Sequence, residues 1–176
     1  MALEHALLVA LREQPASGLD LARRFGRSIG FFWSATHQQI YRVLARMEAD
    51  GWLVATEVAQ TGKPDKKVYD VTPAGADALA AWLAEPTPTH ALRSDLAVKM
   101  RGASFGDREA VLDVVRANLA DHQLRLEHYR SLMRRDYPRP AALTGLDLDH
   151  YLVLRGGILT EETWVTWLTE YLEAHA

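Results

Sequence analysis

The chain has 176 residues, 48% of them hydrophobic and 24% charged, with a formal net charge of −3, which is the composition of an ordinary globular protein of one domain or two small ones. Without cysteine it has no disulfides and no thiolate metal site, which fits a reducing cytoplasm. No run approaches the roughly 18 apolar residues of a membrane span and no basic leader opens the chain, so we expect a cytoplasmic protein with no membrane partner.

The basic residues are gathered toward the N-terminal end. Residues 1–72 hold nine Lys and Arg against eight Asp and Glu, and eight of those nine lie between Arg23 and Lys67. Residues 147–176 hold six acids and one Arg. This asymmetry favours a protein that turns one end toward phosphate, although the negative total argues against high non-specific affinity for nucleic acid.

Three helices are predicted first. Ala2–Glu13 is almost entirely apolar and predicts a helix buried on most sides. Ser17 has the character of a cap for a second, short helix that ends at Gly26, and Asp20 suits its first turn. A third helix is expected from Ser34 or Thr36 to the Asp50-Gly51 stop. Its apolar residues recur on one face: Ile40, Val43, Leu44 and Met47.

A β-hairpin is expected next. Residues 52–58 and 66–71 are β-branched and partly alternating, and the segment 60–65 between them is rich in turn residues. Thr72 followed by Pro73 is a strong start signal for a fourth helix. Residues 85–89, with two prolines, form the linker between predicted domains 1–85 and 90–176.

The second domain is predicted to be helical throughout. A short helix (94–100) precedes two long ones, residues 107–136 and 148–175. Both carry apolar or aromatic side chains at alternating steps of three and four, which is a heptad seam. The first seam is Leu112, Val115, Leu119, His122, Leu126, Tyr129 and Met133, and the second is Tyr151, Leu154, Ile158, Glu161, Val165, Leu168 and Leu172.

The order helix, helix, helix, hairpin is that of a winged helix-turn-helix, so the fold class is mainly α with a small β-hairpin wing. In such a domain the third helix enters the major groove of double-stranded DNA by its N-terminal turn. Here the hydrogen-bonding side chains of that helix are Thr36, His37, Gln38, Gln39, Tyr41 and Arg42, and the wing carries Lys63, Lys66 and Lys67. Gln reads adenine, Arg reads guanine, and lysines bind phosphate. The alternative is that these residues form an ordinary solvated surface.

The stretch SATHQQIYRVLARMEADGWLVATEV, followed by KKVYDVTPAGADALAAWL, resembles the PadR family of bacterial transcriptional regulators. The most specific pieces are Ile40-Tyr41, Gly51-Trp52-Leu53, Tyr69 and Gly75, while Met47 stands where Leu is commoner. The second half resembles the helical dimerisation domain of that family. The resemblance implies a homodimer on an inverted-repeat operator, usually a repressor, that a small molecule releases. It carries DNA contact onto Thr36, His37, Gln38, Tyr41, Arg42 and the three wing lysines.

The two seams favour a dimer, because two long apolar stripes need more cover than a small N-terminal domain supplies. The predicted dimerisation residues are Leu112, Val115, Leu119, Leu126, Tyr129, Met133, Leu154, Ile158, Val165 and Leu168. The alternative is a helical hairpin within one chain. His122 is interpreted either as a hydrogen-bonded residue of a partly wet interface or as a pH-sensitive contact, and Glu161 either as a partner for an Arg or as a solvated edge.

Trp164, Trp167 and Tyr171 form an aromatic ridge that belongs either to a packed interface or to a pocket for a flat aromatic effector. Gly156-Gly157 in the same helix indicates close helix approach, or else room for a ligand.

We find no phosphate loop, no nucleophile motif and no paired metal ligands, so neither catalysis, a metal nor a cofactor is expected. The remaining rival is a winged helix used only for protein–protein assembly.

Overall fold

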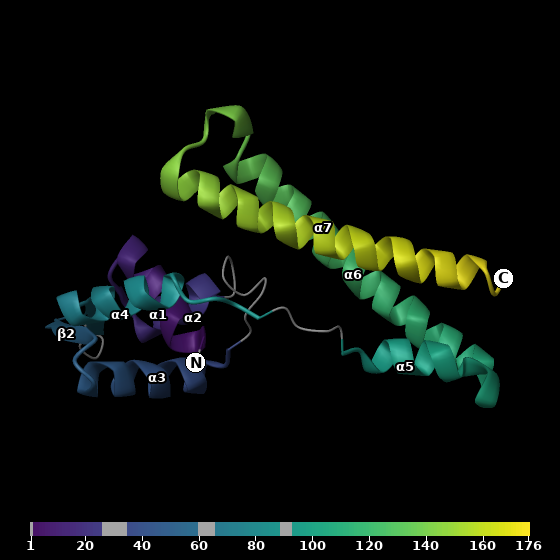
Figure 1. Cartoon of the computed structure of the whole chain (residues 1–176), viewed down its shortest axis with the longest axis horizontal. Coiled ribbons are helices and arrows are strands. Elements are labelled where there is room, and N and C mark those ends of the chain that lie inside the picture. The colour runs from purple at the N-terminus through teal and green to yellow at the C-terminus, as the bar shows by residue number, and fades with distance from the viewer. Residues whose placement is uncertain (1, 26–34, 60–65, 89–92) are drawn as a thin grey trace. The chain divides into compact units, whose positions relative to one another are not determined.

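The computed structural model describes residues 2–25, 35–59, 66–88 and 93–176 and divides the chain into two compact units, Met1–Pro88 and Thr89–Ala176 (Figure 1). Each unit has its own hydrophobic core. The predicted turn at 60–65, which includes Lys63, lies outside the described residues.

In its described residues the first unit has four helices and a small antiparallel sheet. Its elements are α1 (Ala2–Glu13), β1 (Ala16–Ser17), α2 (Gly18–Phe25), α3 (His37–Ala49), β2 (Leu53–Val58), β3 (Lys66–Val71) and α4 (Pro73–Leu83). The strand order is β1-β3-β2, and β2 pairs with β3 from Leu53↔Val71 to Val58↔Lys66. The helix, helix, helix, hairpin order of a winged helix-turn-helix is thereby confirmed.

The local start signals work as the sequence predicts. The Ser17 hydroxyl accepts the backbone N–H of Asp20 at 3.2 Å and caps α2. The Thr72 hydroxyl accepts the N–H of Gly75 at 3.1 Å and caps α4, with Pro73 at the first helical position. These helices begin where backbone N–H groups find a side-chain acceptor.

The short strand β1 was not predicted. It pairs antiparallel with β3 through Ala16↔Tyr69 and Ser17↔Val68. A segment of two residues is too short to show the alternation of apolar and polar residues that predicts a strand. It is a strand only because it pairs with β3, more than fifty residues later in the chain. Through this pairing, the segment between α1 and α2 becomes part of the same sheet as the wing.

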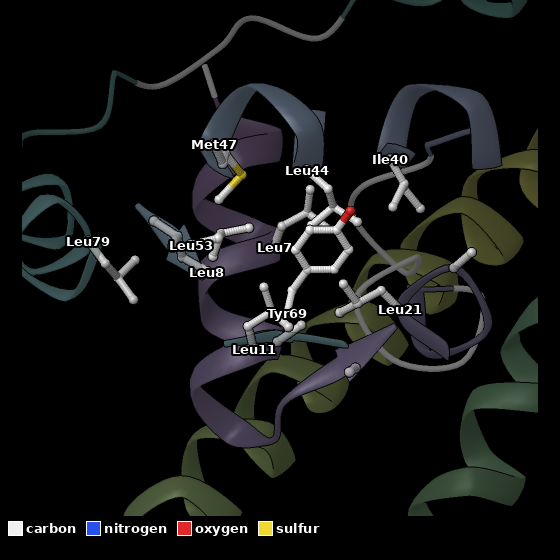
Figure 2. Close-up of a cluster of buried hydrophobic side chains, with 13 residues drawn as sticks. Leu7, Leu8, Leu11, Leu21, Ile40, Leu44, Met47, Leu53, Tyr69 and Leu79 are labelled. Atoms are coloured by element: carbon white, nitrogen blue, oxygen red, sulfur yellow. The ribbon is translucent and has the colours of Figure 1, made fainter. Parts of the chain in front are cut away.

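The core of the first unit gathers side chains from every helix and from the hairpin (Figure 2). Leu7, Leu8 and Leu11 of α1 lie at its centre and are fully buried. Tyr69 of β3 and Leu79 of α4 add to the cluster. The helix that was predicted to be buried on most sides is therefore the one around which the others pack.

The second unit is helical throughout. Its elements are α5 (Asp95–Gly102), the 3-10 turn η2 (Ala103–Phe105), α6 (Arg108–Asp136), the 3-10 turn η3 (Pro140–Ala142) and α7 (Gly145–Glu173). Asp107 caps α6 as the sequence predicts, since its carboxylate accepts the N–H of Ala110 at 3.1 Å. The helix α7 begins three residues earlier than predicted.

The helices α6 and α7 pack antiparallel as a hairpin, with Tyr137 against Tyr151 near the turn and Val115 beside Leu168 farther along. All ten predicted dimerisation residues are buried or half-buried within the single chain. Leu112, Val115, Leu126, Tyr129, Leu154, Ile158 and Leu168 are buried, and Leu119, Met133 and Val165 are half-buried. The structure thus has the intramolecular hairpin that the sequence left as the alternative, and contact of these residues with a second copy stays a prediction.

The two adjacent glycines of α7 have different surroundings, and Gly157 lies next to the Tyr129 ring of α6. A Cβ added there would lie 3.4 Å from the ring of Tyr129, which is an ordinary van der Waals contact, so the close helix approach predicted for the glycine pair does not require glycine at this position. Gly156 faces open space. A side chain at Gly75 in α4, by contrast, would overlap the backbone carbonyl oxygen of Trp52.

We expect Gly75→Ala to lower the free energy of unfolding by about 1–3 kcal/mol, because the backbone of α4 or of the chain at Trp52 must move. Gly156→Ala is the matched control and should raise it by roughly 0.5–1 kcal/mol, since it only removes the entropic cost of glycine in a helix. Urea unfolding followed by circular dichroism measures both. Equal stability of the two variants would contradict the close approach at Gly75.

Candidate nucleic-acid interface

The helix α3 has two sharply different faces. Ile40, Leu44 and Met47 have 0% exposure and point into the core (Figure 2). His37, Gln38, Tyr41 and Arg42 are exposed on the other side, and we call these four residues the recognition surface. A helix that is anchored by one face and offers hydrogen-bonding side chains at its N-terminal half has the form that reading of the major groove requires.

The start of α3 is held by a capping box. The Thr36 hydroxyl accepts the backbone N–H of Gln39 at 3.2 Å, and the Gln39 side-chain oxygen accepts the N–H of Thr36 at 2.9 Å. Both residues were predicted to contact DNA. Their described hydrogen bonds fix the end of the helix that carries the recognition surface, and contact of these two exposed residues with DNA stays a prediction.

Tyr41 is placed by a glycine. Its ring lies against Gly18 at the start of α2, where an added Cβ would overlap the ring carbons. The tyrosine is still 46% exposed. The absence of a side chain at Gly18 thus lets α2 and α3 approach each other while one part of the tyrosine ring remains accessible.

An ion pair joins α3 to α1. The Arg46 guanidinium donates to the carboxylate of Glu4, which is buried at the start of α1. Sequence reasoning counted Arg46 only among the basic residues. Its partner lies 42 positions earlier, and no local pattern links the two.

The two described wing lysines are each paired with an acid of the helix-turn-helix. Lys66 Nζ lies 2.6 Å from Asp20 Oδ2 on α2, and Lys67 Nζ lies 2.7 Å from Glu48 Oε2 on α3. The Lys66 ammonium, together with the Ser17 hydroxyl, lowers the pKa of Asp20 below its ordinary value. Sequence reasoning missed both acids as partners of the wing. Lys63 lies outside the described residues.

The seam of the second unit contains a polar cluster. Glu161 is only 8% exposed, and its carboxylate lies 2.5 Å from His122 Nδ1 and 3.2 Å from Arg125 Nε. The His122 ring also stacks on Trp164 at 5.0 Å between centroids. This confirms the interpretation of Glu161 as a partner for an Arg and of His122 as a hydrogen-bonded residue.

The predicted aromatic ridge packs against a small core. Trp164, Trp167 and Tyr171 lie against the buried Met100, Val115 and Leu168. The Tyr171 hydroxyl donates to the Met100 carbonyl at 2.9 Å, which ties α7 to α5. A shallow hollow on α7 is lined by Leu159, Glu162, Thr163, Thr166, Trp167 and Glu170. Of the three ridge aromatics, Trp167 alone lines this hollow.

Neither a metal cluster nor a membrane span is found in the described part of the chain. No three His, Asp or Glu residues there gather closely enough to hold a metal ion. No described helix is long and apolar enough to cross a membrane.

Two protein-family models cover most of the chain. Residues 7–81 match the transcriptional regulator PadR-like family, and residues 92–176 match the virulence activator alpha C-terminal family. The chain is 50% identical to the probable transcriptional regulator Rv1176c of Mycobacterium tuberculosis, over 99% of this chain and 97% of that protein. The chain belongs to the PadR-like family of transcriptional regulators.

Solved structures of PadR-family proteins share its fold. The negative transcriptional regulator PadR of Bacillus subtilis is 30% identical over 97% of this chain and 95% of its own. Its structure in complex with operator DNA matches with a TM-score of 0.86, 27% identity and 99% of each chain covered. Its complex with p-coumaric acid gives 0.80, with 27% identity and 99% and 98% covered.

The virulence activator AphA of Vibrio cholerae also matches, with a TM-score of 0.81, 30% identity and 99% of each chain covered. These likenesses confirm a winged-helix unit followed by a helical C-terminal region.

Proposed function

We propose that this PadR-family transcriptional regulator reads an inverted-repeat operator as a homodimer through the recognition surface of α3. The observation that carries the proposal is the division of this helix, with three fully buried residues on one face and His37, Gln38, Tyr41 and Arg42 exposed on the other. The match to Bacillus subtilis PadR in complex with operator DNA supports it.

The roles within the recognition surface follow from side-chain chemistry. Gln38 has the donor and acceptor needed to bind adenine in a bidentate way, and Arg42 has the paired donors that fit guanine. His37 and Tyr41 bind phosphate at the edge of the groove. Thr36 and Gln39 contact the same strand from the first turn while their capping hydrogen bonds hold the helix start.

We expect Gln38→Ala and Arg42→Ala each to weaken binding to upstream DNA by roughly 1–3 kcal/mol and to relax the preference for one base pair, because each removes a base-edge contact. Gel shifts with a series of single-base operator variants measure this. Arg134→Ala, which removes an exposed arginine of the second unit, is the control and should bind as the unaltered protein does. Unaltered DNA binding of Gln38→Ala and Arg42→Ala would remove both residues from the interface, and failure of the unaltered protein to bind upstream DNA would favour the protein–protein assembly function.

Homodimer formation is proposed because an inverted repeat needs two recognition helices related by a two-fold axis. Exposed apolar side chains of the second unit support a second copy as the partner. Phe105 is 94% exposed, Val98 is 72% exposed and Leu124 is 73% exposed. Leu124 lies on α6 away from the residues that contact α7, so the internal hairpin leaves it uncovered.

Sedimentation at micromolar protein should give a particle of twice the 19.7 kDa chain mass. We expect Leu124→Glu to weaken the dimer at least tenfold, because it buries an uncompensated charge in the interface. The neighbouring exposed Gln123→Glu adds the same charge and serves as the control. A lone protomer for the unaltered chain would overturn the dimer, and equal dimerisation of both variants would remove Leu124 from its interface.

We propose repression as the sign of regulation, supported by the 30% identical negative regulator PadR, while AphA, an activator by name, has the same fold. A reporter fused to the upstream region decides between the two: repression predicts that deletion of the regulator raises expression.

A small aromatic effector that releases the DNA is proposed for the ridge of Trp164, Trp167 and Tyr171. The complex of Bacillus subtilis PadR with p-coumaric acid supports an effector of this class, and Trp167 lines a surface hollow. We expect a panel of phenolic acids, p-coumaric acid included, to quench tryptophan fluorescence, and Trp167→Phe to remove most of the quenching. Failure of every compound in the panel to quench would count against an aromatic effector.

A further inference from the structure

The wing of a winged helix is a two-stranded ribbon, and a ribbon of this size has little stability of its own. In this chain the outer end of the described wing, where Val58 pairs with Lys66, is joined to both helices of the helix-turn-helix by ion pairs. Lys66 contacts Asp20 in the first turn of α2, and Lys67 contacts Glu48 in the last turn of α3. Adjacent residues of a strand point to opposite faces, so the two pairs hold the strand from two sides.

The partial burial of three of these four side chains favours a structural role. The Lys66, Asp20 and Glu48 side chains are 34%, 33% and 32% exposed, whereas the Lys67 side chain is 47% exposed. Lys67 also lies 5.5 Å from the centre of the Tyr69 ring, and Tyr69 is buried in the core. Both ammonium groups are therefore engaged by the protein before any phosphate approaches.

We propose that Asp20 and Glu48 are positioning residues, which hold the wing at a fixed angle to α3 through Lys66 and Lys67, and that these two lysines do not neutralise phosphates. This inference rests on the proposed function and revises the role that the sequence predicts for the two lysines. A phosphate contact and a positioning contact make opposite predictions for the acids. Removal of an acid frees a phosphate-binding lysine and tightens DNA binding, whereas removal of a positioning acid loosens the wing and weakens binding.

The test uses the full chain with Glu48→Gln, Lys67→Gln and the double variant, and with Asp20→Asn and Lys66→Gln as a second pair. Asp50→Asn is the matched control, because Asp50 also lies at the end of α3 but outside these ion pairs. This control measures how the loss of one negative charge at the end of α3 changes DNA affinity when no wing ion pair is broken. Affinity for a duplex from the upstream region is measured over a range of salt concentrations.

We expect Glu48→Gln and Lys67→Gln each to weaken DNA binding about two- to fivefold, the range of an exposed ion pair, and the double variant to weaken it no further. The slope of log affinity against log salt should stay unchanged, whereas loss of a phosphate contact lowers it by about one. The inference is overturned if Lys67→Gln lowers the slope by about one while Glu48→Gln tightens binding at least as much as Asp50→Asn.

A measurement without DNA separates this inference from the proposed function. Amide hydrogen exchange of β2 and β3 should be faster in Glu48→Gln, Lys67→Gln and Asp20→Asn than in the unaltered protein and in Asp50→Asn. Unchanged exchange in the wing would overturn the positioning role even if DNA binding is intact. Failure of the unaltered chain to bind the duplex would instead refute the proposed function and leave the exchange result to decide the positioning role.

Discussion

The packing of one face of α3 onto the core of the first unit is the contact on which the rest depends. Ile40, Leu44 and Met47 are fully buried against α1 and the hairpin, so the direction of the opposite face is fixed by core packing. Shortening any of these side chains leaves a cavity that costs about 2–5 kcal/mol and also permits the helix to shift. Fold stability and presentation of the recognition surface are therefore properties of the same three residues.

Local sequence signals correctly predicted those features of the fold that depend on residues close together in the sequence. Ser17, Thr72 and Asp107 cap their helices as predicted, and the helical period correctly divides α3 into a buried and an exposed face. Strand β1 and the carboxylate partners of the wing were missed, because strand pairing and ion pairing there join segments that are far apart in the sequence. The sequence thus identified which residues face solvent, but not which of them form ion pairs with other parts of the chain.

The second unit shows the limit of a heptad pattern. Spacing of three and four establishes that a stripe of α6 is buried, but it contains no information about whether the covering helix comes from the same chain. In the structure α7 covers it, and the ring of Tyr129 lies beside Gly157. Exposed apolar residues of α6 such as Leu124, which we propose for the contact with a second copy, lie outside the pattern and could be recognised only once the internal pairing was known.

The buried carboxylate of Glu161 favours one alignment of this hairpin. If α7 slid along α6 by two turns, apolar positions of the two heptad seams would again face each other. Glu161 would then lose His122 and Arg125 and lie as a charge among hydrocarbon, which costs about 3–5 kcal/mol. These contacts of Glu161 therefore favour one register of α7 on α6, together with the Tyr137–Tyr151 contact near the turn and the Arg130–Glu162 ion pair.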